Sequence, residues 1–437
     1  MADSTTTSAR PSAQVPTSTP TPMASADHDT LEAPGALTTL SHVNVPYSQT
    51  WNHLNVNEVS LRMPQPIHRG EVTARLPQIL RQVEAGIGAE AVAWVESSAG
   101  DARYIEVPRG THREEPLLVE ANADAGEVRD TGILVREGAH ATVAVVSHAA
   151  GAASSAGSTH TETATTVSAA RAFHRHSANL VRIIAERNAT VRIVEIIALG
   201  EDSTHLEGIG IEADGGASIE VRQYALGGGQ VALGFEAQLR GRSSRLQLDL
   251  RYVARGHERL DVNQMVRQRG LDTRCDIQST GVLADSAHKT LRETIDLVHG
   301  AKGSKGNEAE TVLVTGDDVV NRTLPVILCD EDDVAGNHGA SIGSVSAEQL
   351  AYLRDRGLSE GEAVALFSRA IFDDAAIHAP EDASLVAALD RAAEVLGDEI
   401  AHDLADGLGL TDGLRGSAAP CDGRGLHDGD DPQEGQS

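Results

Sequence analysis

Cysteine, aromatic side chains and positive charge are all scarce in this chain of 437 residues. The three cysteines include no CxxC pair, which argues against a disulfide framework or a self-contained zinc site. Aromatic residues make up 3% of the chain, too few for the stacking surfaces of a sugar-binding cleft. There are 36 Lys and Arg against 64 Asp and Glu, and because the net charge of -28 repels phosphate backbones, we expect no nucleic-acid partner.

Long apolar runs are missing as well. No stretch approaches the roughly 20 apolar residues that a membrane-spanning helix needs, and the N-terminus has neither a basic region nor an apolar signal core. We therefore expect a cytoplasmic protein that does not bind membranes. The chain does contain 40% hydrophobic and 23% charged residues, which is the composition of a globular protein with a buried core.

Changes in composition divide the chain into successive regions. The two ends are dominated by small and polar residues that cannot offset the entropy of ordering, whereas the middle is rich in β-branched residues and the part after it in helix formers. The predicted order is a disordered tail (1–40), an N-terminal helical subdomain (41–90), a β-rich core (91–345) with a flexible loop (149–170), a C-terminal helical domain (346–407) and a second disordered tail (408–437).

The middle of the chain consists of short extended segments divided by glycine-rich turns about every dozen residues. Apolar and polar residues alternate within them, as in Leu246-Gln247-Leu248-Asp249-Leu250, so one face of each strand is expected to be buried. The expected strands are 91–95, 131–135, 141–146, 190–199, 218–226, 231–239, 245–253 and 259–266. Such strands fit an antiparallel sandwich or barrel, or a parallel solenoid, and the scarcity of Asn-Gly and Asp-Gly hairpin turns favours the solenoid.

Capping boxes predict where the C-terminal helices begin. In both Ser346 to Gln349 and Ser359 to Glu362, a hydroxyl is followed three residues later by a side chain that can complete the box. Leucines and alanines at three-and-four spacing follow each box, as expected for amphipathic helices. A third helix is predicted over residues 384–404, where leucine and isoleucine residues form a single stripe.

The candidate site residues lie between the strands and these helices. His338 is flanked by small residues that would leave its imidazole accessible, although a turn histidine bonded to a backbone carbonyl would look the same. Cys329 could be a metal ligand, but the apolar run before it favours a small core residue. The acidic run 330–333 lacks EF-hand spacing and is better explained as a solvated turn. The chain has neither the Lys-Ser/Thr pair of a P-loop nor a nucleophile elbow.

The residues around His338 resemble the C-terminal signature of the SufB/SufD family. The resemblance is carried by Asp332-Asp333-Val334, by His338-Gly339-Ala340 and by the segment 350–358, and it covers residues 180–375 well. Gly339 stands where SufB-type sequences have a glutamate after the histidine, which favours the SufD type. Gly336 stands where family members often have a cysteine, so no thiolate can assist His338 from that position.

The resemblance implies a right-handed parallel β-helix, a solenoid, with helical N-terminal and C-terminal regions. It implies a non-catalytic scaffold subunit of the SUF machinery, which pairs through its β-helix with a SufB-like subunit or with a second copy of itself. His338 would then contribute to a transient iron-sulfur cluster at that interface. A polysaccharide-active β-helix enzyme is the alternative function.

The resemblance also implies that the C-terminal helices bind a SufC-like ATPase. Aromatic and arginine side chains suit protein interfaces, so we expect the contact at Tyr352, Arg354, Arg356 and Phe367. Simple capping of the end of the solenoid would explain the leucines of these helices equally well.

Overall fold

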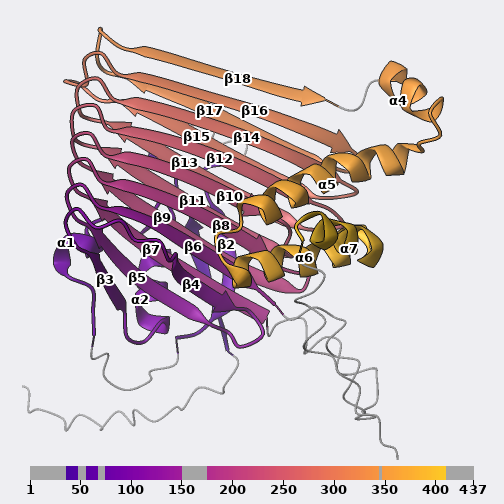
Figure 1. Cartoon of the computed structure of the whole chain (residues 1–437), viewed down its shortest axis with the longest axis horizontal. Coiled ribbons are helices and arrows are strands. Elements are labelled where there is room, and N and C mark those ends of the chain that lie inside the picture. Colours follow the sequence, from indigo (N-terminus) through magenta and orange to yellow (C-terminus); the bar gives the residue numbers. More distant parts are fainter. Residues whose placement is uncertain (1–35, 48–55, 67–73, 150–174, 344–346, 410–437) are drawn as a thin grey trace, which may run out of the picture. The chain divides into compact units, whose positions relative to one another are not determined.

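In the computed structural model, which describes residues 36–47, 56–66, 74–149, 175–343 and 347–409, the chain forms two parallel sheets of eight strands each. Consecutive strands alternate between the sheets, so each strand pairs with the second strand before it and the second strand after it. Figure 1 shows the strands stacked in this order, with β18 outermost. This arrangement is a β-solenoid, and it confirms the predicted fold class.

Each coil of the solenoid contributes one strand to either sheet. The odd-numbered sheet contains β3 (Arg103–Val107), β5 (Val128–Val135), β7 (Arg175–Ala185), β9 (Ser203–Ala213), β11 (Gln230–Leu239), β13 (Arg259–Gln268), β15 (His288–Leu297) and β17 (Val320–Cys329). The even-numbered sheet contains β4 (Leu117–Asn122), β6 (His140–His148), β8 (Thr190–Ala198), β10 (Ser218–Ala225), β12 (Arg245–Ala254), β14 (Arg274–Ala284), β16 (Lys305–Thr315) and β18 (Ala335–Gly343). Arg245 pairs with Arg274 and Arg274 with Lys305, so a coil takes roughly 30 residues, a usual length for a solenoid repeat.

The alternating pattern of the sequence places the core between the two sheets. In β12 the leucines at 246, 248 and 250 are buried while the intervening residues are exposed or half-buried, as the pattern predicts. The same alternation in neighbouring coils stacks valine, isoleucine and leucine into one continuous apolar interior. The expected strands from 131 to 266 all coincide with strands of the structure, with ends that differ by only a few residues.

The N-terminal region is mixed, whereas the sequence predicted helices alone. It contains β1 (Leu37–Val43) and β2 (Val59–Pro64), which pair antiparallel, followed by α1 (Gln78–Arg81) and α2 (Ala89–Ser98). The two strands form because Leu40 and Leu61 face each other across the pair and are both buried. Since β1 begins at Leu37, regular structure starts inside the predicted tail. Residues 1–35 of that tail, 150–170 of the predicted loop and 410–437 of the second tail lie outside the described residues.

The strand predicted at 91–95 is wrong, because this segment lies within α2. Its apolar residues Ala91, Trp94 and Val95 are buried at the three-and-four spacing of a helix face, and Trp94 Nε1 donates to the carbonyl of Pro64 at 2.9 Å. A short apolar run fits a buried strand and a buried helix equally well, so its pattern alone was ambiguous. The first strand of the solenoid is therefore β3, which begins at Arg103.

Four helices follow the last strand: α4 (Ala347–Arg354), α5 (Glu360–His378), α6 (Asp382–Leu396) and α7 (Asp398–Gly407). The predicted capping box of α5 is confirmed, since Ser359 Oγ accepts from Glu362 N at 3.3 Å and the Glu362 carboxylate accepts from Ser359 N at 2.7 Å. The box predicted at Ser346 lies outside the described residues. The single helix predicted over 384–404 is wrong, because Gly397 adopts a φ of 99° and divides it into α6 and α7.

Helices α5, α6 and α7 cover part of the outer face of the even-numbered sheet (Figure 1). Phe372 and Leu389 pack there against Val194 and Tyr224 of the strands. The Arg391 guanidinium, almost fully buried, pairs with Glu258 at 2.7 Å and so ties α6 to the solenoid. Among the helices that the structure describes, none is long and apolar enough to cross a bilayer.

Candidate functional site

His338 lies on the last strand of the solenoid. β18 pairs with β16 on one side, and within the described chain its other edge carries no strand. All of its residues are exposed, and the His338 side chain is 54% accessible to solvent. The accessibility predicted for this imidazole is therefore confirmed, and it arises because no further coil covers the strand.

Along the stacked positions that lead to His338, the interior of the solenoid changes from apolar to polar. In the even-numbered sheet, register pairs six apolar residues in successive strands and then continues through Glu308 to His338. The apolar members of this column are Leu117, Val143, Ile193, Val221, Leu248 and Ile277. Because paired residues in a parallel sheet point to the same face, His338 stands on the interior-facing side of the last coil, directly after Glu308.

Glu308 is a buried carboxyl group with no hydrogen bond. Its side chain is 1% exposed, and neither carboxyl oxygen has a hydrogen-bond partner among the described residues. His338 Nδ1 lies 3.7 Å from Glu308 Oε1, beyond hydrogen-bond distance. Burial, helped by the neighbouring Glu293 carboxyl, raises the pKa of Glu308 to about 9.

Glu310, two residues further along β16, is also buried but is fully engaged. It accepts hydrogen bonds from Lys289 Nζ, from the Thr323 hydroxyl and from the Tyr252 hydroxyl, the last at 2.8 Å. Lys289 is itself buried, and this desolvation lowers the pKa of its ammonium group. Tyr252 comes from β12, two strands away in the same sheet, and its ring passes over Gly281, where a Cβ would be only 2.0 Å from the ring.

Neither of the two cysteines that the structure describes, Cys275 and Cys329, joins His338 in a ligand set. Cys329, for which the sequence favoured a core position, ends β17 and is exposed, and its Sγ donates to the carbonyl of Glu331 at 3.4 Å. Cys275 is buried, and the loss of solvent raises the pKa of its thiol well above the usual range, so it is unreactive. Within the described ranges no three His, Cys, Asp or Glu side chains form a group that could hold a metal ion.

The residues predicted for the ATPase contact are exposed. Tyr352 is 58% and Phe367 is 48% accessible, and the Arg356 guanidinium lies 3.9 Å from the centre of the Tyr352 ring. Arg354 is exposed on α4. The structure thus brings Tyr352 and Arg356 together. It also exposes Leu366 beside Phe367, which the sequence analysis did not single out.

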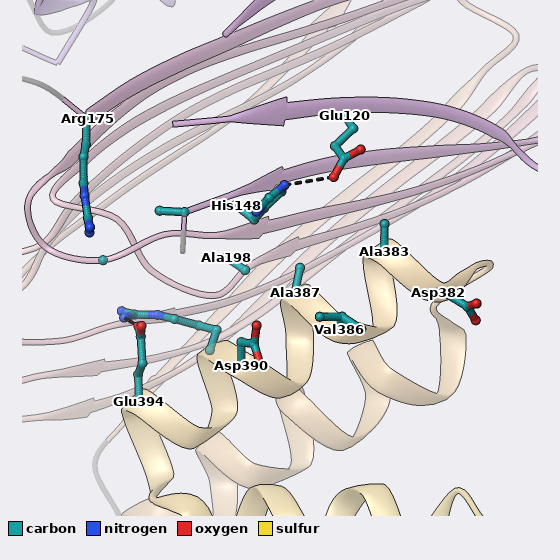
Figure 2. Close-up of a pocket in the computed structure, with 13 residues that line it drawn as sticks. Glu120, His148, Arg175, Ala198, Asp382, Ala383, Val386, Ala387, Asp390 and Glu394 are labelled. Carbon is teal, nitrogen blue, oxygen red and sulfur yellow. Dashed lines mark hydrogen bonds and ion pairs between the residues drawn. The ribbon is translucent and has the colours of Figure 1, made fainter. Parts of the chain in front are cut away.

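A hollow of about 330 Å³ lies between α6 and the strands and turns of the solenoid (Figure 2). The figure shows Asp390 of α6 across from His148 and Glu120, and His148 Nε2 lies 2.9 Å from Glu120 Oε1. Arg391 in its wall pairs with Glu394 at 2.8 Å. Glu120, His148, Arg391 and Glu394 are thus paired with one another within the wall of the hollow.

A family model described as the SufBD core domain of SUF system FeS cluster assembly matches residues 119–371, which is more than half of the chain. This range holds all but the first strand and part of β4 of the solenoid, together with Glu308, His338 and most of α5. The matched region therefore includes the candidate site, α4 and most of α5, and it excludes the N-terminal region.

Individual relatives match over shorter stretches. The iron-sulfur cluster assembly protein SufD of Bacillus subtilis is 32% identical over 111 residues, which cover 25% of each chain. An iron-sulfur cluster assembly SufBD family protein of Mycobacterium bovis is 28% identical over 214 residues, 48% of this chain and 25% of its own length. A SufBD family protein of Methanocaldococcus jannaschii is 31% identical over 113 residues, 26% of this chain and 35% of its own. The matches thus span only a quarter to a third of the length of these relatives.

Proposed function

The chain belongs to the SufBD family of the SUF iron-sulfur cluster assembly system, and on that premise we propose that it is a SufD-like scaffold subunit. It pairs through the last coil of its solenoid with a SufB-like subunit, and its C-terminal helices bind a SufC-like ATPase. It performs no catalytic step itself. Iron and sulfide are the cargo, and the cluster forms at the interface with the partner.

The open last coil is the observation that supports this proposal most strongly. Within the described ranges no strand pairs with the outer edge of β18, which presents its backbone together with His338 and Ile342, the latter 57% exposed. Proteins usually cover or charge such an edge to prevent unwanted pairing, whereas β18 reads AGNHGASIG and carries no Lys, Arg, Asp or Glu. An exposed, uncharged edge strand is suited to pair with another chain, and a second solenoid end would supply a matching edge.

His338 suits a site that must release its product. An imidazole is a borderline ligand that binds iron, while stable cluster ligation takes about four ligands, mostly thiolates. This chain offers one accessible histidine at the last coil and three cysteines in all. A cluster held by His338 therefore needs further ligands from the partner, such as cysteine and carboxylate, and separation of the subunits would release it.

The decisive experiment is reconstitution of the complex with SufB-like and SufC-like subunits. We expect His338→Ala to leave folding and complex formation unchanged but to lower the yield of iron, sulfide and visible absorbance, because the variant lacks one ligand. His402→Ala removes an exposed histidine of α7 and serves as the matched control, and Cys275→Ser should also have little effect. Full cluster yield from the His338→Ala complex would return this residue to the role of a turn histidine.

The ATPase contact is tested separately by co-purification. Tyr352→Ala together with Arg356→Ala removes the stacked pair formed by α4 and the turn that follows it, and should reduce recovery of the SufC-like subunit, as should Phe367→Ala on α5. Tyr104→Ala together with Arg109→Ala, at the opposite end of the solenoid, is the control. Unchanged ATPase recovery with the α4 double variant would leave these helices with the role of capping the solenoid.

A further inference from the structure

Glu308 and His338 present two metal-binding atoms that face each other across a gap. Nδ1 of His338 and Oε1 of Glu308 are 3.7 Å apart, too far for a hydrogen bond. Two donor atoms that share one metal ion each lie about 2.1 Å from it, so their separation stays below roughly 4 Å. The observed gap therefore fits a single ion held between the two side chains.

The surroundings of Glu308 supply an independent reason for a ligand. A buried carboxyl group costs free energy unless it is hydrogen-bonded or paired, and this one is 1% exposed with both oxygens unsatisfied among the described residues. Glu310 on the same strand shows how the solenoid normally satisfies such a group, with an ammonium and two hydroxyls. Glu308 has no equivalent donors, although it is as deeply buried.

Glu308 and His338 are polar at positions that are apolar in the preceding strands. Preceding strands fill the same column with valine, isoleucine or leucine, and an apolar residue at 308 would continue that packing. The column becomes polar only in the final two strands of its sheet, where the solenoid is open. The neighbours of His338 on the same face of β18 are Gly336 and Ala340. Because both are small, no large side chain of this strand obstructs the approach to the gap from the exposed edge.

We propose that Glu308 and His338 form a two-residue half-site that binds one divalent metal ion, in which the buried Glu308 carboxyl group releases its proton to solvent as the ion binds and His338 supplies the accessible imidazole ligand. The identification of that ion with ferrous iron rests on the proposed function. The half-site explains why a carboxyl group is placed beneath an exposed imidazole, and it leaves the remaining coordination positions to water or to a partner subunit. A carboxylate and an imidazole are a ligand pair suited to ferrous iron.

The test is a Co²⁺ titration of the full-length chain alone at physiological salt, because the net charge of -28 attracts divalent ions weakly everywhere. Nitrogen-15 spectra of the histidine side chains report the ion locally, and we expect the His338 signal to broaden first. Glu308→Gln, which keeps the shape of the side chain, and His338→Asn should each weaken this binding by about tenfold or more, since even outer partners of metal ligands typically contribute that much. Glu348→Gln combined with His402→Asn is the control for loss of a surface charge and a surface histidine.

Three outcomes overturn the half-site: no selective effect of Co²⁺ on His338, an unchanged affinity in Glu308→Gln, or an equal loss in the control variant. Thermal unfolding with and without Co²⁺ provides a second readout, because an ion that binds only the folded chain raises Tm, and that rise should be smaller in Glu308→Gln. Neither measurement requires a partner or cluster synthesis. Failure of the half-site would therefore be seen independently of failure of the scaffold role.

Discussion

The middle and the last coil of the solenoid have the same backbone arrangement but different surroundings. In β12 the inward-facing Leu248 and Leu250 are buried because strands lie on both sides, whereas every residue of β18 is exposed because a strand lies on one side only. Burial in a solenoid is thus supplied by the following coil. Among the described strands, β18 is the one whose residues are all exposed, so its inward face is open to a ligand or a partner.

The two buried glutamates of β16 make the same contrast at the level of single residues. Glu310 belongs to the closed interior, where Lys289, Thr323 and Tyr252 satisfy it. Glu308 belongs to the column that opens at His338, and its carboxyl oxygens have no hydrogen bond among the described residues. Substitutions that affect only one of the two glutamates therefore test whether a buried carboxyl group contributes differently to stability in the closed interior and at the open end.

The largest effect is expected where a closed contact is broken. Lys289→Met leaves the Glu310 carboxylate buried without its cation, and loss of one partner of such a pair typically costs about 3–5 kcal/mol of the free energy of unfolding. Urea denaturation measures it. Glu308→Gln is the comparison, and it should lie within about 0.5 kcal/mol of the parent chain because it breaks no hydrogen bond. Equal losses from both substitutions would erase the distinction between the glutamates.

Apolar side chains should show a similar, slightly smaller difference. Leu248→Ala removes a buried side chain from the middle of the core and should destabilise the chain by about 2–5 kcal/mol. Ile342→Ala removes a comparable side chain from the last coil, where it is 57% exposed, and should cost no more than about 0.5 kcal/mol. In complex with a partner on the last coil, Ile342→Ala should instead weaken association, and an unchanged dissociation constant would contradict pairing through this face.

The smallest effect is a dependence of stability on pH that originates in the closed interior. Glu207 in β9 is fully buried, which raises its pKa to about 8, so the folded chain keeps a proton that the unfolded chain releases near the ordinary glutamate pKa of 4.5. The stability that this group contributes is complete below pH 4.5 and is lost as the pH rises toward 8, by roughly 1 kcal/mol per pH unit. Burial also raises the pKa values of Glu236, Glu293 and Glu308, so the contribution of Glu207 is measured as the difference between the parent chain and Glu207→Gln in thermal unfolding between pH 7 and pH 8.

The window above pH 7 is chosen because His205, also fully buried, acts in the opposite direction. Burial lowers the pKa of His205 to about 3, so the stability that this residue contributes is lost as the pH falls below the ordinary histidine pKa of 6.5. Glu207→Gln should flatten the decline of Tm between pH 7 and pH 8. A decline of unchanged steepness in this variant would assign the pH dependence to other groups, of which Glu195 is the first to substitute because its pKa is also strongly raised by burial and by Glu207.

The sequence predicted the solenoid well because alternation and glycine turns act locally. The segments at 218–226 and 245–253 show both signals, and both are strands. The segment 91–95 failed because its apolar run carries no alternation, and the helix over 384–404 failed because a single glycine at 397 adopts a positive φ that the amphipathic stripe does not reveal.

The candidate site was predicted only in part. His338 was found through its motif, whereas Glu308 was missed because its meaning depends on the register between coils. The coil length of roughly 30 residues becomes known only when the strands are paired. Once it is known, Glu308 can be identified in the sequence as the residue one coil before His338. The exposure of Cys329 could not be predicted from the sequence either, because the apolar run before it belongs to β17, a strand that is only partly buried.

Tyr252 gives the end of the solenoid a form of cooperativity that stacked repeats usually lack. In most such arrays each repeat contacts only its immediate neighbours, so terminal repeats fray one at a time. The Tyr252 ring crosses Gly281 and its hydroxyl reaches Glu310, which joins β12 directly to β16 and skips the strand between them. Opening of the coil that contains β16 must break this bond, so backbone amides of β14 and β16 should exchange with solvent hydrogen as one unit.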